Sequence, residues 1–302
     1  MNSGIINVYK EAGYTSFDVV ARLRGILKIK KIGHTGTLDP DATGVLPVCI
    51  GKGTRVCDLL TNKDKVYEAV FRLGITTDTY DISGSITSQN DVNSSEEEVV
   101  RVIESFVGEI LQVPPMYSAL KVDGKKLYEY ARAGVEIERK ARPVTIYSID
   151  VLKTDLPEVS IRVHCSKGTY IRSLIHDIGK ELGCGAVMTS LVRTKVGNFD
   201  ISEAKNLNEI ERIFQAGNID KIITKTDEVF DSYPTLFVFG DDEVIKHAMN
   251  GCVIEISQVF SESVSSFSEG ELFRIYLPDN RFLGLYEYKV DSGFKLQKMF
   301  LE

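Results

Sequence analysis

The clearest strand signal in the chain is the alternation of apolar and polar residues over "KVYEAVFRLG", residues 65–74. Side chains on a strand point to opposite faces in turn, so every second residue of this segment shares one apolar face. That face consists of Tyr67, Ala69, Phe71 and Leu73. Further strands are predicted at the start of the segment 6–16, over 45–51 and over 159–165. Tyr67 is therefore expected to point inward, where its phenol is either packed or used.

Apolar residues at helical spacing predict a first helix after the opening strand. Thr15 or Ser16 is expected to cap its N-terminus, because a hydroxyl can accept a hydrogen bond from a free backbone N–H of the first turn. Its apolar face is predicted to be Phe17, Val20, Leu23 and Leu27. The helix ends in the basic run 28–31 and leads directly into the glycine-rich segment 33–44.

Two more helices are predicted further along the chain. One lies within 94–108, after a serine cap and with three glutamates in its first turn, where the helix dipole favours negative charge. Its core-facing residues are Val99, Ile103 and Phe106. The other follows a turn at 166–168 and is closed by Gly183, with an apolar face of Ile171, Leu174, Ile175, Ile178 and Leu182. Strands and helices thus alternate irregularly, which is typical of an α+β domain.

The composition shifts over residues 217–235, and short strand-like runs follow. These runs are "CVIEI" at 252–256, "ELFRIYL" at 271–277 and "FLGLYEY" at 282–288, with turn residues between them. Such spacing predicts a small β-rich domain. We therefore divide the chain into residues 1–231 and residues 232–302.

Length and composition are those of an ordinary globular protein. The 302 residues are 43% hydrophobic, which is enough for a sizeable core. No run of about 18 apolar residues exists, and the first residues lack the features of a signal peptide, so we expect a cytoplasmic protein. The five cysteines form no CxxC pair and the four histidines are scattered, so neither a disulfide framework nor a metal site is predicted.

The acidic net charge of −7 is unevenly distributed. Residues 201–302 contain 18 Asp and Glu against 10 Lys and Arg, whereas the first 200 residues contain 25 against 26. Within the first part, residues 121–142 carry seven Lys and Arg against four Asp and Glu. Local basic surface can bind a polyanion although the total is acidic, because salt screens distant charges. The basic runs 28–31 and 138–142 are equally compatible with solvated faces, so charge alone leaves nucleic-acid binding open.

The segment "GHTGTLDPDATG", residues 33–44, consists of turn-forming residues and candidate chemical groups. Glycine permits positive φ, proline restricts φ, and Asp and Thr bond their own backbone. The segment is either a long connection or a rigid frame for one side chain, with His34, Asp39 and Asp41 as candidates. A single carboxylate such as Asp39 can act as a nucleophile or a general base. If buried, it needs a cationic partner, which spacing alone does not identify.

Common alternatives for such a segment fail on spacing. A phosphate-binding loop would need glycine at position 46 and Ser or Thr at position 53, where the chain has Leu46 and Gly53. "DTYDISG", residues 78–84, lacks the alternating ligand spacing of an EF-hand. No G-x-S-x-G motif is present for a serine hydrolase.

Five blocks of the sequence, in this order, resemble the bacterial tRNA pseudouridine-55 synthases. They are "KIGHTGTLDPDATGVLPVCIGKGTR", "KVYEAVFRLGITTDTYDISG", "VPPMYSALKVDGKKLYEYARAGVEIERKARPV", "HCSKGTYIRSLIHDIGKELGCGA" and "LVRTKVG". The resemblance covers roughly residues 3–200. It implies a mixed-sheet α+β catalytic domain followed by a small C-terminal PUA-like β-barrel that binds RNA. It further implies isomerisation of uridine 55 in the T loop of tRNA, without a metal or an organic cofactor, by a protein that we expect to be a monomer.

The resemblance also implies roles for individual residues. Asp39 matches the catalytic aspartate, which attacks the target nucleotide, and Arg172 matches its arginine partner. Tyr67 matches the tyrosine that stacks on the flipped base and can exchange a proton at C5. The other implied substrate contacts are His34, which takes the place of the extruded uridine, Tyr170 and Leu191 in the uracil pocket, and Lys10 near its floor. Glu11 departs from the family pattern, which has proline there, and puts the role of Lys10 in doubt.

Two other functions fit parts of this pattern. A tRNA-binding folding helper with vestigial catalysis would also use the interleaved basic and aromatic residues 124–132, which the resemblance places in an RNA clamp. A small-molecule carboxylate hydrolase would show no affinity for RNA. The order of bond making, through the sugar, the base or a glycal, stays open at this level.

Overall fold

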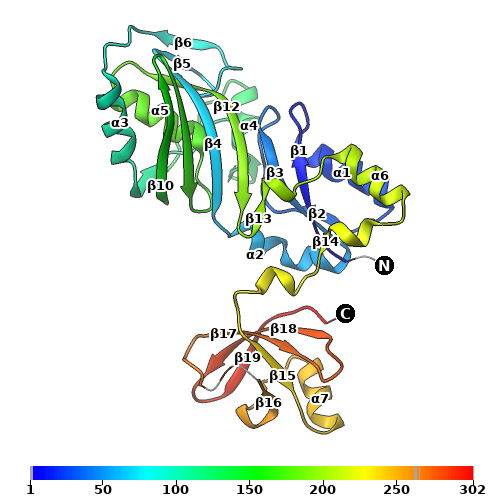
Figure 1. Cartoon of the computed structure of the whole chain (residues 1–302). Coiled ribbons are helices and arrows are strands. Elements are labelled where there is room, and N and C mark those ends of the chain that lie inside the picture. The colour runs from blue at the N-terminus through cyan, green and yellow to red at the C-terminus, as the bar shows by residue number, and fades with distance from the viewer. Residues whose placement is uncertain (1–2, 262–263, 265, 302) are drawn as a thin grey trace.

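A computed structural model describes residues 3–261, 264 and 266–301 of the chain. A large mixed sheet with helices on its faces forms the N-terminal part, and a smaller sheet forms the C-terminal part beneath it (Figure 1). The predicted α+β architecture with a mixed sheet is confirmed. No helix of the described residues is long and apolar enough to cross a membrane.

The order of strands in the large sheet brings distant segments of the chain together. Along the sheet the strands are β14 (Ile223–Thr224), β1 (Gly4–Lys10), β3 (Thr43–Ile50), β12 (Ala186–Val196), β4 (Lys65–Leu73), β11 (Glu158–Cys165), β10 (Arg142–Asp155) and β7 (Gly108–Gln112). Two short strands join at the side, β2 (Ile32–His34) on β3 and β13 (Phe199–Asp200) on β12. β3 and β12 are parallel, and the other neighbours along the sheet are antiparallel. The end of the segment 33–44 therefore lies beside β12, which in turn lies beside β4.

The predicted apolar face of β4 is buried, as the alternation of its residues indicates. Its buried residues face a core that β10, β11 and β12 share with two helices, α3 (Glu96–Ser105) and α5 (Ile171–Glu181). Tyr67 is 8% exposed on this face. Ser95 caps α3, and Gly183 follows α5 with a positive φ of 73°, as the sequence predicts. The opposite face of β4 carries Val66, Glu68, Val70 and Arg72, which are half-buried or exposed.

The other half of the sheet is covered by α1 (Ser16–Leu27) and α6 (Leu207–Gln215), which pack on β1 and β3. Thr15 caps α1, and its hydroxyl accepts a hydrogen bond from Asp18 N. The prediction that Phe17 belongs to the apolar face is wrong, because its side chain is 71% exposed. The buried stripe of α1 is Val19, Val20, Leu23, Ile26 and Leu27. At 100° per residue, Phe17 lies about 120° from the centre of that stripe.

The C-terminal part is a sheet in the order β16 (Val259–Phe260), β15 (Thr235–Val238), β17 (Leu272–Tyr276), β18 (Phe282–Lys289) and β19 (Gly293–Met299), packed on α7 (Asp242–Met249). The predicted strands near 271–277 and 282–288 are confirmed. The strand predicted over 252–256 is wrong: only Ile254 pairs, in an isolated bridge with Phe294, and Val253 and Ile256 are exposed. Within the described residues no pairing closes β16 onto β19 into a barrel.

The two parts share a hydrophobic cluster at their junction. Leu285 and Phe300 pack with Val56 and Leu60, which lie in the helical turn η1 (Gly51–Val56) and in α2 (Cys57–Thr61). The remaining short helical turns are η2 (Ile201–Glu203), η3 (Ile219–Ile222), η4 (Glu228–Phe230) and η5 (Ile256–Gln258). Burial of this cluster ties the C-terminal sheet to the larger part.

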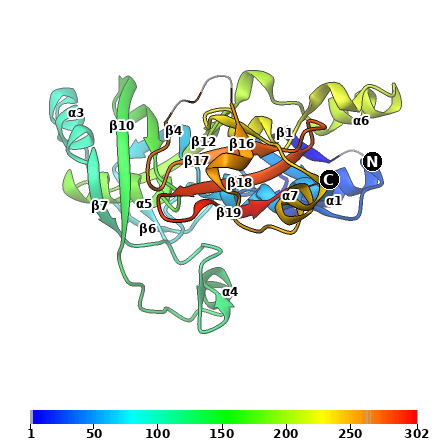
Figure 2. The ribbon, with the colours of Figure 1, turned by 90° about the horizontal axis from the view of Figure 1, so that it is seen from below.

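Two hairpins stand apart from the main sheets. One is β5 (Ile75–Thr77) with β6 (Ile86–Gln89), and the other is β8 (Lys121–Val122) with β9 (Lys125–Lys126). The second hairpin continues into α4 (Leu127–Arg132) and forms an arm that projects away from the large sheet (Figure 2). On this arm Lys126 and Arg132 each lie 5.3 Å from the centre of the Tyr128 ring.

Candidate active site

The segment 33–44 is a frame held by side chains from neighbouring elements. Ser16, in the first turn of α1, accepts a hydrogen bond at its Oγ from Leu38 N at 2.9 Å. On the other side of Asp39, Lys10 Nζ donates to the carbonyl oxygens of Pro40 at 2.9 Å and Ala42 at 2.6 Å. Hydrogen bonds on both sides of one residue restrict its backbone, so the loop presents Asp39 in a defined position.

Arg193 of β12 closes the other end of this frame. Its side chain is 1% exposed, and it donates from Nε to Val45 O at 2.8 Å and from Nη2 to Gly36 O at 3.2 Å. Gly44 lets the backbones of β3 and β12 lie close together here, because a Cβ there would lie 2.2 Å from the backbone oxygen of Arg193, and its φ is 106°. Arg193 was not among the residues singled out in the sequence. In the sequence it appears only as part of the resemblance block "LVRTKVG", and no role was predicted for it.

Asp39 and Arg172 form a two-pronged ion pair. Arg172 Nε lies 3.0 Å from Asp39 Oδ2, and Arg172 Nη2 donates to Asp39 Oδ1 at 3.0 Å. The Arg172 side chain is 6% exposed, whereas Asp39 keeps 38% of its side chain open to the cleft. Burial raises the pKa of Asp39 above its ordinary value, and the Arg172 guanidinium opposes that shift. The pair thus supplies the cation that a buried carboxylate requires.

Asp81 is a second carboxylate beside Arg172. Its Oδ2 lies 3.5 Å from Arg172 Nη1, and its negative charge also raises the pKa of Asp39. Arg172 is held further by hydrogen bonds to the carbonyl oxygens of Thr79 at 3.1 Å and Tyr117 at 2.8 Å. The sequence excludes an EF-hand over residues 78–84 and places them in the second block of the resemblance, but it predicts no role for Asp81. Asp81 is identified by its contact with Arg172, and this contact exists only in the folded chain.

The other predicted substrate contacts line the same cleft, which has a volume of about 1530 Å³. Besides Asp39 and Arg172, these residues are His34, Tyr67, Tyr170 and Leu191. Burial raises the pKa of Tyr67, so its phenol keeps its proton at neutral pH. Burial and the nearby Arg193 lower the pKa of His34, which accepts a hydrogen bond at Nδ1 from Gly36 N. The cleft therefore combines the arginine-paired Asp39 carboxylate with uncharged rings.

Lys10 is not among the residues that line the cleft, and its predicted contact with the substrate stays a prediction. Its side chain is 0% exposed and lies beneath the loop, where Nζ also donates to Glu11 O. Burial lowers the pKa of Lys10 to about 8, although Asp39 and Asp41 act in the opposite direction. Glu11 contributes its backbone carbonyl to this contact. Lys10 is therefore a positioning residue for the loop that carries Asp39.

Replacing Lys10 with methionine is expected to lower the free energy of unfolding by about 1–3 kcal/mol, because loop carbonyls lose a buried donor. The pKa of Lys10 is about 8 in the folded protein against its ordinary 10.5, so the wild type gains stability as pH rises between those values. The methionine variant lacks this gain, and its deficit should widen over the same range. Urea unfolding at several pH values measures both effects. The exposed Lys52→Met is the matched control, and an equal loss there would contradict the assignment.

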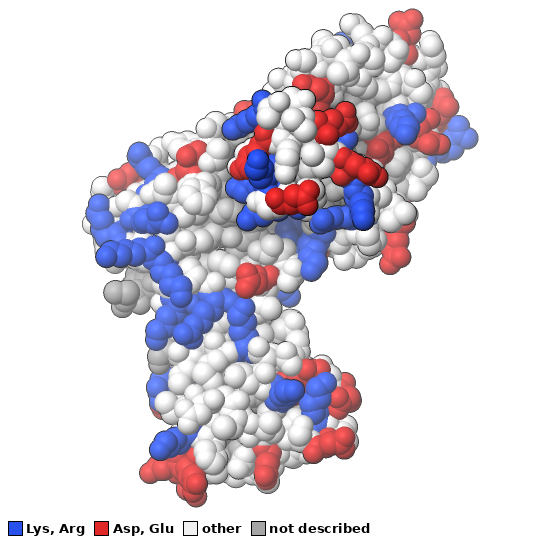
Figure 3. All heavy atoms as spheres, turned by 180° about the vertical axis from the view of Figure 1, so that it is seen from behind, with Lys and Arg blue, Asp and Glu red and all other residues white. Residues whose placement is uncertain are grey.

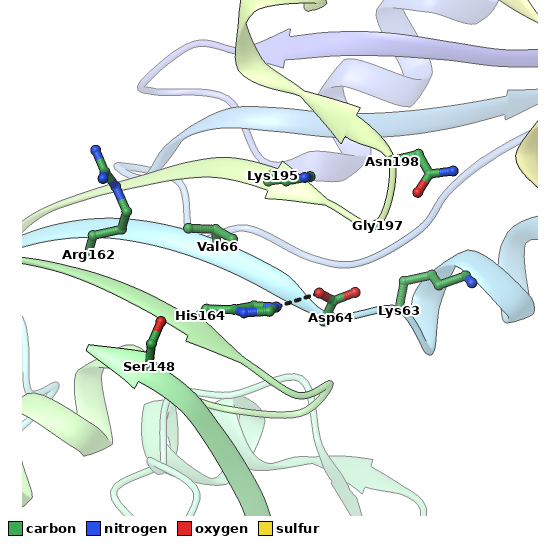
Figure 4. Close-up of a pocket in the computed structure, with 9 residues that line it drawn as sticks. All are labelled: Lys63, Asp64, Val66, Ser148, Arg162, His164, Lys195, Gly197 and Asn198. Carbon is green, nitrogen blue, oxygen red and sulfur yellow. Dashed lines mark hydrogen bonds and ion pairs between the residues drawn. The ribbon is translucent and has the colours of Figure 1, made fainter. Parts of the chain in front are cut away.

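A smaller hollow of about 410 Å³ lies on the opposite face of the sheet (Figure 4). His164 of β11 and Asp64, just before β4, meet there at 2.5 Å between Nε2 and Oδ2. Val66 lines this hollow, and its neighbour Tyr67 faces the other side of the strand. The hollow shares no lining residue with the cleft. We interpret the His164 contact as a link between two strands rather than a part of the candidate active site.

Among the described residues, no group of three or more His, Cys, Asp or Glu side chains is placed to hold a metal ion. The chemistry available in the cleft is that of Asp39 with its arginine partner, a protonated tyrosine and a neutral histidine. Such a set can attack a carbon and exchange a proton.

Comparison with known proteins identifies the family. The model of the TruB family pseudouridylate synthase N-terminal domain matches residues 24–171, and that of the tRNA pseudouridylate synthase B C-terminal domain matches residues 172–230. A tRNA pseudouridine synthase B of Clostridium kluyveri is 47% identical over 99% of both chains. One from Clostridium novyi is 50% identical over 99% of this chain and 100% of that relative.

Solved structures agree with this relationship. A chain in an H/ACA RNP bound to a substrate RNA containing 2'-deoxyuridine superimposes with a TM-score of 0.74 at 26% identity, over 99% of this chain and 85% of that chain. A chain of a Cbf5-Nop10-Gar1 complex gives the same TM-score at 28% identity and the same coverage. Because the family models span residues 24–230 and the Clostridium relatives match nearly end to end, this chain belongs to the TruB family of pseudouridylate synthases.

Proposed function

We propose that this protein isomerises uridine 55 in the T loop of tRNA to pseudouridine. The observation that carries the proposal is the Asp39 carboxylate, which Arg172 holds through two nitrogens while it stays 38% exposed to a large cleft. The relatives named tRNA pseudouridine synthase B support tRNA as the substrate. The T arm is the finer part of the proposal and rests on the resemblance of five sequence blocks.

In the proposed reaction the bond between C1′ and N1 of the uridine breaks, the uracil turns, and C1′ is joined to C5. The proton leaves C5, and N1 carries a proton in the product, so the change is an isomerisation without a co-substrate. Asp39 acts as the nucleophile, on the sugar or on the base, or as the base that forms a glycal. Arg172 favours the ionised form of Asp39, which each of these routes requires.

The neutral rings of the cleft suit an extruded base. A stacked uridine hides its glycosidic bond, so the enzyme takes the base out of the helix and compensates for the lost stacking. We assign Tyr67 to stacking on the target uracil and to proton exchange at C5. Tyr170 and Leu191 line the same pocket, and His34 takes the place of the extruded base in the RNA stack. The low pKa of His34 keeps it uncharged for such stacking.

The C-terminal part is proposed as an RNA-binding domain of the PUA-like kind, over residues 232–302 beside a catalytic domain over residues 1–231. Its separate hydrophobic core and the end of the family-model matches at residue 230 support this division. Lys and Arg side chains gather along one side of the molecule, from the larger part down to the junction, and suit a phosphate backbone (Figure 3). The monomeric state, the cytoplasmic location and the lack of an organic cofactor stay predictions.

The test of this function is tritium release from a T-arm stem-loop labelled at uridine C5. Wild-type protein is expected to release tritium in step with pseudouridine formation. Tight binding without release would favour the folding-helper function instead. Affinity for the stem-loop should also fall steeply with salt, as expected for phosphate contacts. If the wild-type protein does not bind the stem-loop and releases no tritium, that result would contradict any RNA-directed function.

Tyr67→Phe is expected to keep the affinity for the stem-loop but to lower turnover by about 10²–10⁴-fold, the usual contribution of a positioned acid or base. The phenyl ring preserves stacking, and only the hydroxyl is lost. Single-turnover tritium release and a binding titration on the same preparation separate these effects. Turnover at the wild-type rate would exclude proton exchange by Tyr67.

A further inference from the structure

Phe17 is an aromatic side chain that the candidate active site leaves unused. It is 71% exposed, and among the described large hydrophobic residues only Leu111 is more exposed. Its side chain lines the same cleft as Asp39 and Arg172. None of the ring–ring or cation–ring contacts of the described residues involves Phe17. A phenyl ring is thus presented to the cleft without a partner.

The position of Phe17 relative to Asp39 is held by the frame described above. Ser16, its neighbour in the chain, is bonded through Oγ to the backbone N–H of Leu38 at 2.9 Å. Leu38 in turn precedes Asp39. The cap at Thr15 anchors the same turn, because Asp18 and Thr15 bond each other's backbone N–H groups. Phe17 is therefore carried by a helix whose first turn is bonded to the loop of Asp39, rather than by a loose loop.

The surroundings of Phe17 indicate what it binds. Lys126 and Arg132 of the arm also line the cleft, so cations and aromatic rings lie on the same surface. This combination is typical of surfaces that bind single-stranded nucleic acid, where bases stack on rings and phosphates meet cations. The other rings of the cleft are less available. Tyr67 is 8% exposed, and Tyr128 is already in contact with Lys126 and Arg132. His34, Tyr117 and Tyr170 are half-buried.

We propose that Phe17 forms a second stacking subsite, which takes an unpaired base of the substrate RNA adjacent to the target uridine. This inference rests on the proposed function, because it assumes an RNA loop in the cleft. The target base itself belongs to Tyr67, so the occupant of the Phe17 subsite is a neighbouring base. The subsite helps to hold the loop open while the target is extruded.

The test uses a T-arm stem-loop carrying 2-aminopurine at one unpaired position at a time, because stacking quenches its fluorescence. Binding is measured in the Asp39→Asn protein, where no turnover changes the RNA. Adding Phe17→Ala is expected to weaken binding about tenfold, within the range measured for loss of one base–aromatic stack. The quench should be lost at one position beside the target. The salt dependence of binding should stay the same, because no phosphate contact is removed.

Two control variants keep the result specific. Phe17→Tyr retains an aromatic ring and should bind within about twofold of the parent protein, since every aromatic face can stack. Leu111→Ala removes an equally exposed apolar side chain that does not line the cleft, and should leave binding unchanged. Unchanged affinity of Phe17→Ala, or an equal loss in Leu111→Ala, would overturn the subsite.

Failure of this inference and failure of the proposed function give different results. If wild-type protein releases tritium from uridine C5 and Phe17→Ala binds like its parent, only the subsite is wrong. If wild-type protein neither binds nor turns over the stem-loop, the proposed function is wrong and the subsite falls with it.

Discussion

Replacing Asp39 with asparagine is expected to lower turnover by about 10⁴-fold or more, the scale on which loss of a nucleophile reduces other covalent catalysts. The amide has nearly the shape of the carboxylate but no negative charge with which to attack the nucleotide. Arg172 retains its hydrogen bonds to the carbonyls of Thr79 and Tyr117, so the fold around the site is preserved. Tritium release from the C5-labelled stem-loop measures the loss.

The affinity of Asp39→Asn for tRNA decides between two roles of the residue. Retained binding with lost turnover is the result expected for a nucleophile. Loss of binding to the same extent as turnover would mean that Asp39 maintains the loop instead. Asp41 offers a matched control on the same loop, because its carboxylate has no ion pair among the contacts of the described residues. Asp41→Asn should therefore reduce turnover far less than Asp39→Asn.

Replacing Arg172 with methionine is expected to lower turnover at neutral pH by about 10²–10³-fold, a typical result of losing one preorganised electrostatic partner. Burial and the charge of Asp81 already raise the pKa of Asp39, and Arg172 opposes both. Without the guanidinium the pKa of Asp39 rises further, so the active, ionised form appears only at higher pH. The acidic limb of the pH–rate profile should move upward, and turnover should partly recover as pH rises.

Arg172→Met should also lower the free energy of unfolding, by at most about 3 kcal/mol. Loss of one partner of a buried pair leaves a charge uncompensated, but here the Asp39 carboxylate stays partly solvated at 38% exposure, which reduces the effect. Arg172→Lys is the matched variant, because it keeps the charge but loses the planar fork that reaches both oxygens of Asp39. Its acidic limb should stay near that of the wild type. A pH profile of Arg172→Met identical to the wild type would contradict this role of Arg172.

Local patterns in the sequence predicted most of the elements that surround the cleft. The alternation over β4 predicted Tyr67 on the inner face. Side chains of a strand alternate with a period of two, so this prediction does not depend on the neighbouring strands. The serine cap and glutamates before α3, and the glycine after α5, located those helices in the same local way. The glycine, proline and aspartate content of residues 33–44 left open whether the segment is a long connection or a rigid frame, and the hydrogen bonds on both sides of Asp39 show a frame.

Local patterns failed where a neighbour decides the outcome. The spacing of Phe17 fits a helical face. However, the face of α1 that packs against the sheet contains Val19 and Leu23, so the Phe17 side chain lies in the cleft instead. The run 252–256 has the composition of a strand, yet only Ile254 finds a partner. Propensity describes what a segment can form, whereas pairing requires an available edge.

The sequence by itself determined the inward face of β4 and the turn-forming character of residues 33–44, because both depend on residue type and on spacing along the chain. Spacing along the chain did not identify which charges meet: the resemblance implied the pair of Asp39 and Arg172, and the tertiary structure shows its geometry and adds Asp81. Asp39 and Arg172 are 133 residues apart in the sequence. Lys10 of β1 and Arg193 of β12 are also far apart in the sequence, yet both donate hydrogen bonds at the same loop. These contacts follow from the order β1–β3–β12–β4 in the sheet. The interaction energy of two charges depends on the distance between them in space, and positions in the sequence do not give that distance.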